Sequence, residues 1–215
     1  MAEEMSISPW HDIPLHNLED GSYNMVIEIP KWTRVKNEIA TGEPYNPIKQ
    51  DVRNGVLREY KWGDMFFNYG AFPRTWEDPS HISPDTGCKG DNDPLDAVEI
   101  GLKQHAVGSI VKVKVLGILA MIDAGETDWK VVTISVSDPI ADLINDIDDV
   151  ETHMPGALSA LREWLRKYKT AEGKEHNVFG LEEEFMGRDY ALKIVEETHE
   201  FWTKLTEAKG GMAVV

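Results

Sequence analysis

The chain has 215 residues, 41% hydrophobic and 28% charged, which is typical of a globular protein long enough to bury a substantial core. A net charge of −16 disfavours general binding to nucleic acid or to an anionic membrane surface, and no apolar run is long enough to span a bilayer. The first residues (MAEE) lack signal-peptide features and the single Cys88 excludes an internal disulfide, so we expect a cytoplasmic protein.

The first two thirds of the chain are rich in strand patterns. Alternating or β-branched segments lie at 24–29 (NMVIEI), 110–119 (IVKVKVLGIL) and 131–136, with shorter pieces near 57–61 and 97–101. Gly, Pro and Asp residues separate these segments, as expected for turns. The pattern predicts a β-rich central region.

The C-terminal third has helical periodicity. Apolar side chains at helical spacing follow Pro155, namely Leu158, Leu161, Leu165 and Tyr168. A second, longer helix is expected around Tyr190–Leu205, ending before Gly210. No repeat or linker is visible. We predict one mainly β, α+β domain over residues 1–215, a compact β-barrel flanked by two or three helices, with 1–22 as an N-terminal extension and 206–215 as a C-terminal tail.

Three aspartates crowd into residues 89–96 (KGDNDPLD). Pro94 disfavours a helix here and biases Asp93 towards an extended backbone, in which Asp91 and Asp93 would point to one side. The turn after Pro94 could then bring Asp96 to join them. Adjacent carboxylates repel one another, and hard divalent cations such as Mg²⁺ favour oxygen ligands. Taken alone, however, the run also fits an acidic turn that faces solvent.

Two further acidic clusters are visible. Residues 123–130 (DAGETDWK) lie between two strong strand patterns, with Gly125 for a turn, and by themselves they favour an ordinary polar hairpin loop. Glu28 alternates against the apolar residues of its strand and could line the polar side of a barrel, with Lys36 and Glu38 close behind in sequence.

Basic and phenolic side chains that could bind an anion are spread along the chain, at Arg58, Tyr69, Lys130, Tyr168 and Lys169. Most isolated lysines and arginines are solvated surface residues, and a tyrosine at helical spacing is more often part of a core. Sequence spacing cannot bring these groups together.

Four segments in the same order closely resemble soluble inorganic pyrophosphatases of family I: 24–32 (NMVIEIPKW), 68–73 (NYGAFP), 90–96 and 123–130. Residues 75–79 (TWEDP) support the eukaryotic type. The resemblance runs from about Tyr23 to Leu205. It implies a five-stranded OB-like closed barrel with helices packed against it, a homodimer, and hydrolysis of pyrophosphate to two phosphates with Mg²⁺.

The resemblance also assigns roles to individual residues. Asp91, Asp96 and Asp128 match ligands of the tighter metals, and Asp123 and Glu38 match ligands of metals that arrive with the substrate. Asp93 resembles the general base that takes a proton from the attacking water. The phosphate-binding set is matched by Lys36, Arg58, Tyr69, Lys130, Tyr168 and Lys169. Glu28 matches an acidic position at the same site.

One position departs from the family pattern. Met65 stands where the first tyrosine of the YxxxY pattern is expected, in residues 65–69 (MFFNY). A phenol that would donate a proton or order water is therefore absent there. The role is dispensable, or water or another residue supplies it, or activity is altered.

Alternatives from other functional classes fit the sequence less well. A non-enzymatic barrel could bind divalent cations or phosphate. A protein that binds only cations, however, needs no anion-binding set of lysines, arginine and tyrosines. A calcium loop fails because Leu95 stands where an oxygen ligand is required and the glycine is missing. A metal-dependent nuclease fits poorly with the acidic surface.

Overall fold

The computed structural model describes residues 7–208. Its strands are β1 (Tyr23–Ile29), β2 (Asn37–Ile39), β3 (Ile48–Gln50), β4 (Val52–Arg53), β5 (Val56–Leu57), β6 (Asn68–Ala71), β7 (Lys89–Gly90), β8 (Asp96–Glu99), β9 (Ile110–Asp123), β10 (Glu126–Ser135), β11 (Val178–Phe179) and β12 (Phe185–Gly187). Its α-helices are α1 (Ile147–His153), α2 (Ala157–Lys167) and α3 (Arg188–Ala208). Short 3₁₀ turns occupy Ala141–Leu143, Thr170–Glu172 and Leu181–Glu183.

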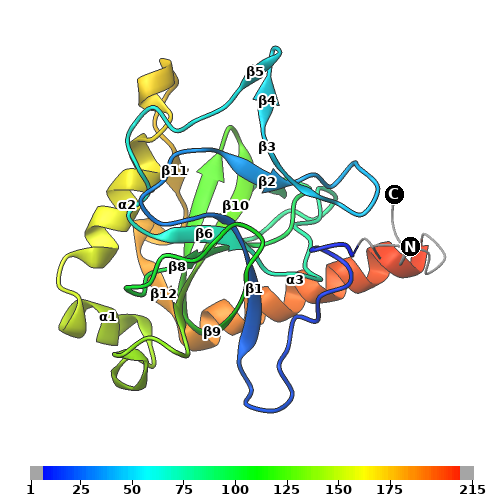
Figure 1. Cartoon of the computed structure of the whole chain (residues 1–215). Helices are drawn as coiled ribbons and strands as arrows, with labels where there is room; N and C mark the ends of the chain where they lie inside the picture. The colour runs from blue at the N-terminus through cyan, green and yellow to red at the C-terminus, as the bar shows by residue number, and fades with distance from the viewer. Residues whose placement is uncertain (1–6, 209–215) are drawn as a thin grey trace, which may run out of the picture.

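Five strands are joined by backbone pairing into a closed ring. The order is β1, β6, β8, β10, β9 and back to β1. Only the β8–β10 pair in this ring is parallel. The long strand β9 also pairs with β11 and β12, so it pairs with four of the strands in residues 7–208 (Figure 1). The mainly β fold with flanking helices expected from the sequence is confirmed.

The sheet is buried on both faces. Along β9, Leu119 and Met121 belong to the apolar cluster that contains α2, whereas Ile118 and Ala120 belong to the cluster that contains α3. Successive strand residues point to opposite faces, so one apolar run can serve both clusters. Figure 1 shows α1 and α2 at one side of the sheet and α3 running beneath it. Each fully buried large aliphatic side chain stabilises this packing by roughly 1.5–3 kcal/mol.

Most of the predicted elements are present. The patterns at 24–29, 110–119, 131–136 and 97–101 correspond to β1, β9, β10 and β8, whereas the region near 57–61 contains only the short β5 and an isolated bridge at Glu59. The two predicted helices are α2 and α3; the predicted end before Gly210 lies outside the described residues. Helix α1 was not predicted, because it is only seven residues long. Its capping box pairs Asp146 with Asp149.

Two local expectations were wrong. Residues 91–93 are not extended: Asn92 has a φ of 75°, and the Asp93 amide donates to Asp91 Oδ1 at 3.0 Å. Residues 123–130 are not one loop either. The turn is confined to Ala124 and Gly125, both with positive φ, so Asp128 and Lys130 lie within β10.

The segment before β1 packs against the residues that follow it in the chain. Trp10 and Leu15 are 3% and 1% exposed, and Trp10 Nε1 donates to the Thr75 carbonyl oxygen at 2.7 Å. Among residues 7–208, no helix is both long and apolar enough to cross a membrane.

Candidate active site

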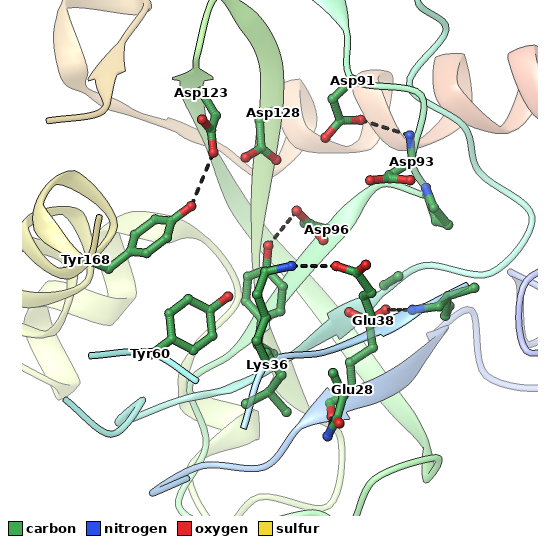
Figure 2. Close-up of a pocket in the computed structure, with 16 residues that line it drawn as sticks. Glu28, Lys36, Glu38, Tyr60, Asp91, Asp93, Asp96, Asp123, Asp128 and Tyr168 are labelled. Carbon is green, nitrogen blue, oxygen red and sulfur yellow. Dashed lines mark hydrogen bonds and ion pairs between the residues drawn. The ribbon is translucent and has the colours of Figure 1, made fainter. Parts of the chain in front are cut away.

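An acidic cavity of about 170 Å³ opens on one side of the strand ring. Its charged and phenolic lining residues come from six different strands and from the loops between elements: Glu28, Lys36, Glu38, Tyr60, Tyr69, Asp91, Asp93, Asp96, Asp123, Asp128 and Tyr168. Figure 2 shows the carboxylates converging on one space, with Tyr60 and Tyr168 together at one side. Every residue proposed from the sequence lines this cavity except Arg58, Lys130 and Lys169, which pair with acidic groups in or beside it.

Lys130 lies between two of these carboxylates. Its side chain is buried, and its ammonium group donates to Asp128 on the same strand and to Asp96 on β8. Burial alone lowers the pKa of the ammonium group, but the charges of Asp128 and Asp96 outweigh that effect and hold it well above its ordinary value. The lysine therefore stays charged and offsets part of the local negative charge.

Two tyrosines are hydrogen-bonded to carboxylates of the cavity. The Tyr69 hydroxyl donates to Asp96 Oδ2 at 2.5 Å, and the Tyr168 hydroxyl donates to Asp123 Oδ2 at 3.2 Å. Lys169 donates to the other oxygen of Asp123. Tyr168 caps the end of α2, so this helix brings the phenol and the neighbouring lysine to the tip of β9.

Two more basic side chains, Lys36 and Arg58, lie close together at the edge of the cavity. Lys36 donates to Glu38 Oε2 at 2.5 Å and to Asp51 Oδ2 at 3.0 Å. Arg58 donates to the same Asp51 oxygen at 2.5 Å and lies 3.7 Å from Glu172. Asp51 therefore holds Lys36 and Arg58 side by side.

Glu28 is buried and lines the cavity. Its Oε1 accepts a hydrogen bond of 2.7 Å from the Ile39 amide, which ties β1 to β2. Burial, followed by the charge of Asp96, raises the pKa of this carboxyl group to about 8. The pKa of Asp93 is raised to about 6 by burial and by the charges of Asp96 and Glu38.

Glu77 belongs to the same acidic group, although it was not among the residues proposed from the sequence. One oxygen each from Glu77, Asp91 and Asp128 lie within 4.8 Å of one another. Oε1 of Glu77 accepts from the Trp129 amide at 3.1 Å, whereas the buried Oε2 has no hydrogen-bond partner among residues 7–208. Burial, followed by the charges of Asp91 and Asp128, holds the pKa of Glu77 well above its ordinary value.

These three carboxylates fit a hard divalent cation. A buried carboxylate oxygen without a donor is costly, and a cation bound by oxygen ligands removes that cost. Gly90 allows the arrangement, because a Cβ there would lie 2.5 Å from the carbonyl carbon and oxygen of Glu77.

Known proteins match almost the whole chain. A model of the family described as inorganic pyrophosphatase matches residues 25–203. The chain belongs to the inorganic pyrophosphatase family. The expected resemblance is thereby confirmed, and the enzyme class is that of an inorganic diphosphatase.

Individual family members agree over long stretches. Soluble inorganic pyrophosphatase 6, chloroplastic, from Arabidopsis thaliana is 54% identical over 94% of this chain and 67% of its own length. The inorganic pyrophosphatase of Bos taurus is 51% identical over 95% of this chain and 73% of its own length. The chain spans 50% of inorganic pyrophosphatase 1 from Caenorhabditis elegans, at 52% identity.

Solved structures of family members superpose closely. The N-terminally truncated Trypanosoma cruzi vacuolar soluble pyrophosphatase, in complex with PPi, has a TM-score of 0.90 and 51% identity, covering 94% of this chain and 80% of that one. The Trypanosoma brucei brucei inorganic pyrophosphatase gives a TM-score of 0.91 at 52% identity, covering 94% of this chain and 62% of that one.

The family pattern itself contained a signal for Glu77. It lies in residues 75–79 (TWEDP), the segment that indicated the eukaryotic type of pyrophosphatase. By itself the segment indicates the subgroup and does not mark Glu77 as a ligand. Folding places it against Gly90 and strand β10, and so beside Asp91 and Asp128.

Proposed function

We propose that this chain hydrolyses inorganic pyrophosphate to two orthophosphates with Mg²⁺, and that Asp93 is the general base. One observation carries the proposal. A single cavity of a pyrophosphatase fold combines clustered carboxylates with buried or half-buried lysine and arginine side chains. Pyrophosphate is a compact and highly charged anion, so binding it needs both. The acidic chain as a whole would otherwise repel it.

Asp93 is suited to accept a proton from water. It lines the cavity next to Asp91, and its pKa of about 6 keeps it largely deprotonated at neutral pH, close enough to neutrality for efficient proton transfer. The oxygen of the attacking water forms a bond to one phosphorus as the bridging P–O bond breaks. Asp93 takes the proton, and the second phosphate leaves.

Basic and phenolic groups would bind the phosphate oxygens. Arg58 can grip two oxygens at once, whereas Lys36, Lys130 and Lys169 act as point charges. Tyr69 and Tyr168 keep their protons, since burial and neighbouring charges hold both pKa values above the ordinary range, and their O–H groups would exchange Asp96 and Asp123 for phosphate oxygens. Preorganised donors of this kind stabilise the charge that develops on the leaving phosphate.

The carboxylates would hold the metal ions. Glu77, Asp91 and Asp128 each bring one oxygen to within 4.8 Å of the others, and Asp96, Asp123 and Glu38 line the cavity with Asp91 and Asp128. Bound Mg²⁺ would supply charge neutralisation and lower the pKa of the attacking water. Glu28 accepts a hydrogen bond from the Ile39 amide and would thereby fix the strand that carries Glu38.

Further expectations belong to the same proposal. The closed ring of five strands supports the OB-like barrel implied by the resemblance. The homodimer is supported by Trp32 and Trp62, which are 62% and 45% exposed. The cytoplasmic location stays a prediction, because relatives include proteins named as chloroplastic and vacuolar.

The decisive experiment measures phosphate release from pyrophosphate with and without Mg²⁺, beside ATP and tripolyphosphate. We expect fast, Mg²⁺-dependent release from pyrophosphate. The variant Asp93→Asn should lose turnover and keep metal binding, measured by calorimetry with Mn²⁺. No release with any divalent metal would favour the alternative, a barrel that only binds cations or phosphate. Turnover that survives in Asp93→Asn would show that the assigned base is wrong.

A further inference from the structure

The position of Met65 is closed off from the cavity. Its side chain is 0% exposed and belongs to the apolar cluster that contains Phe67 and Trp164 of α2. It is absent from the residues that line the cavity. A methionine thioether offers no O–H donor. The site therefore takes no phenol from the position where the family pattern places its first tyrosine.

Tyr60 brings a third phenol to the cavity, five residues earlier in the chain. It lines the cavity with Tyr69 and Tyr168 and is only 8% exposed. The segment that carries it runs antiparallel to residues 34–36: the Tyr60 amide donates to the Arg34 carbonyl oxygen at 2.8 Å, and the Lys36 amide donates to the Arg58 carbonyl oxygen at 3.1 Å. The backbone of Tyr60 is thus fixed beside two of the phosphate-binding candidates.

Aromatic packing sets the direction of the Tyr60 ring. The ring lies edge-on to Trp164 and to Tyr168, with centroid separations of 5.1 and 5.4 Å. Trp164 and Tyr168 stack on each other at 5.2 Å. Edge-to-face contacts of this kind stabilise one orientation of the ring. Figure 2 shows the Tyr60 hydroxyl directed from this aromatic group towards the side of the cavity occupied by Lys36.

The Tyr60 hydroxyl differs from the other two phenols in its partners. Tyr69 and Tyr168 donate to Asp96 and Asp123, whereas within the described part of the chain Tyr60 has no carboxylate as hydrogen-bond partner. Its surroundings combine both signs of charge, since Lys36, Lys130, Asp96 and Glu28 all act on it electrostatically. Burial is the main reason that its pKa rises to about 12, so the O–H donor is retained at neutral pH.

We propose that Tyr60 is a substrate-binding residue, whose hydroxyl donates a hydrogen bond to a phosphate oxygen of pyrophosphate and so supplies the phenol that Met65 cannot. The inference rests on the proposed function and extends it to a residue outside the family motifs quoted above. Tyr60 acts with Arg58, on its own segment, and with Lys36, on the antiparallel segment beside it. The third phenol reaches the cavity from segment 58–60 rather than from β6 and the residues just before it.

The variant Tyr60→Phe tests this, because it keeps the ring that packs on Trp164 and Tyr168 and removes only the hydroxyl. We expect kcat/KM for pyrophosphate to fall about ten- to a hundredfold, the range for one hydrogen bond to a charged group. Binding of methylenediphosphonate, a non-hydrolysable analogue, should weaken by a similar factor in the presence of Mg²⁺. The Mg²⁺ concentration needed for half-maximal activity and the unfolding midpoint should stay unchanged.

Tyr45→Phe is the matched control, since Tyr45 is 56% exposed and does not line the cavity. It should leave all four measurements at the level of the unmodified protein. If Tyr60→Phe also leaves kcat/KM and analogue binding unchanged, Tyr60 is a packing residue only and the inference is overturned. That outcome is distinct from failure of the proposed function, in which the unmodified protein itself releases no phosphate; analogue binding then still tests Tyr60.

Discussion

Lys130 and Asp96 occupy paired positions on the parallel strands β10 and β8, and the ammonium group of Lys130 donates to Asp96 Oδ2. The register of this parallel pair brings a buried ammonium group next to a carboxylate that the sequence separates from it by more than thirty residues. Because Asp128 shares the same ammonium group, Lys130 is the internal counter-ion of the cavity.

We expect Lys130→Met to remove that counter-ion and leave two carboxylates facing each other. The free energy of unfolding of the metal-free protein should fall by about 3–5 kcal/mol, as when one partner of a buried ion pair is lost. Turnover should fall about 10²- to 10³-fold, because a preorganised cation near the phosphate is gone. Lys112→Met, which breaks exposed pairs with Asp20 and Glu19, should change stability by less than about 1 kcal/mol. Equal effects of both variants in urea unfolding would contradict this account.

Glu77→Gln should have opposite effects on stability and on metal binding. The amide retains an oxygen for the Trp129 amide but cannot ionise, whereas the buried carboxyl group becomes negatively charged at high pH. At high pH the metal-free variant should therefore be more stable than the unmodified protein, by about 1–3 kcal/mol. Affinity for Mn²⁺, measured by calorimetry, should fall about 10- to 100-fold. Glu200→Gln, an exposed acid on α3, is the control and should change neither quantity. Loss of stability together with unchanged Mn²⁺ affinity would exclude Glu77 as a ligand.

Gly90→Ala should weaken metal binding without removing any ligand. The added Cβ would lie 2.5 Å from the Glu77 carbonyl group, so the backbone that carries Glu77 must shift. We expect a loss of about 1–3 kcal/mol in stability and a weaker Mn²⁺ affinity. Gly42→Ala is the matched control, since a Cβ there meets nothing within 4 Å and the backbone has no positive φ. An unaltered metal affinity in Gly90→Ala would show that Glu77 tolerates the shift.

The metal-free protein should lose stability as pH rises, and Glu28 should cause part of the loss. Its pKa is about 8 in the folded chain against 4.5 for the ordinary group, so between these values the folded state holds a proton that the unfolded state has released. The contribution is fully present below 4.5 and is lost as pH rises through about 8. In Glu28→Gln, the stability difference between about pH 5 and about pH 8.5, measured by urea unfolding in EDTA, should shrink by roughly 1–4 kcal/mol. An undiminished difference would assign the effect to the other carboxylates.

The secondary structure with strong periodicity could be predicted from the sequence, whereas several of the short elements could not. Strands β1, β9 and β10 and helices α2 and α3 carry long apolar patterns, because each buries a whole face. Short elements such as α1 and β6 contain too few residues for a period to be visible. The Asx turn at Asp91 was not predicted, because Pro94 favours an extended backbone in the residue before it. The conformation of Asn92 depends instead on a local hydrogen bond from the Asp93 amide to the Asp91 side chain.

The identity of the acidic motifs and the family they indicate were determined by the sequence alone, since a run such as residues 90–96 is informative without coordinates. Only the tertiary structure decided which groups meet. Glu77 joins Asp91 and Asp128 through close packing on Gly90, and Tyr60 enters the cavity because residues 58–60 pair with residues 34–36. The placement of Glu77 depends on contacts with other segments of the chain, and that of Tyr60 depends on backbone pairing that has no sequence period. Neither kind of contact produces a local sequence pattern.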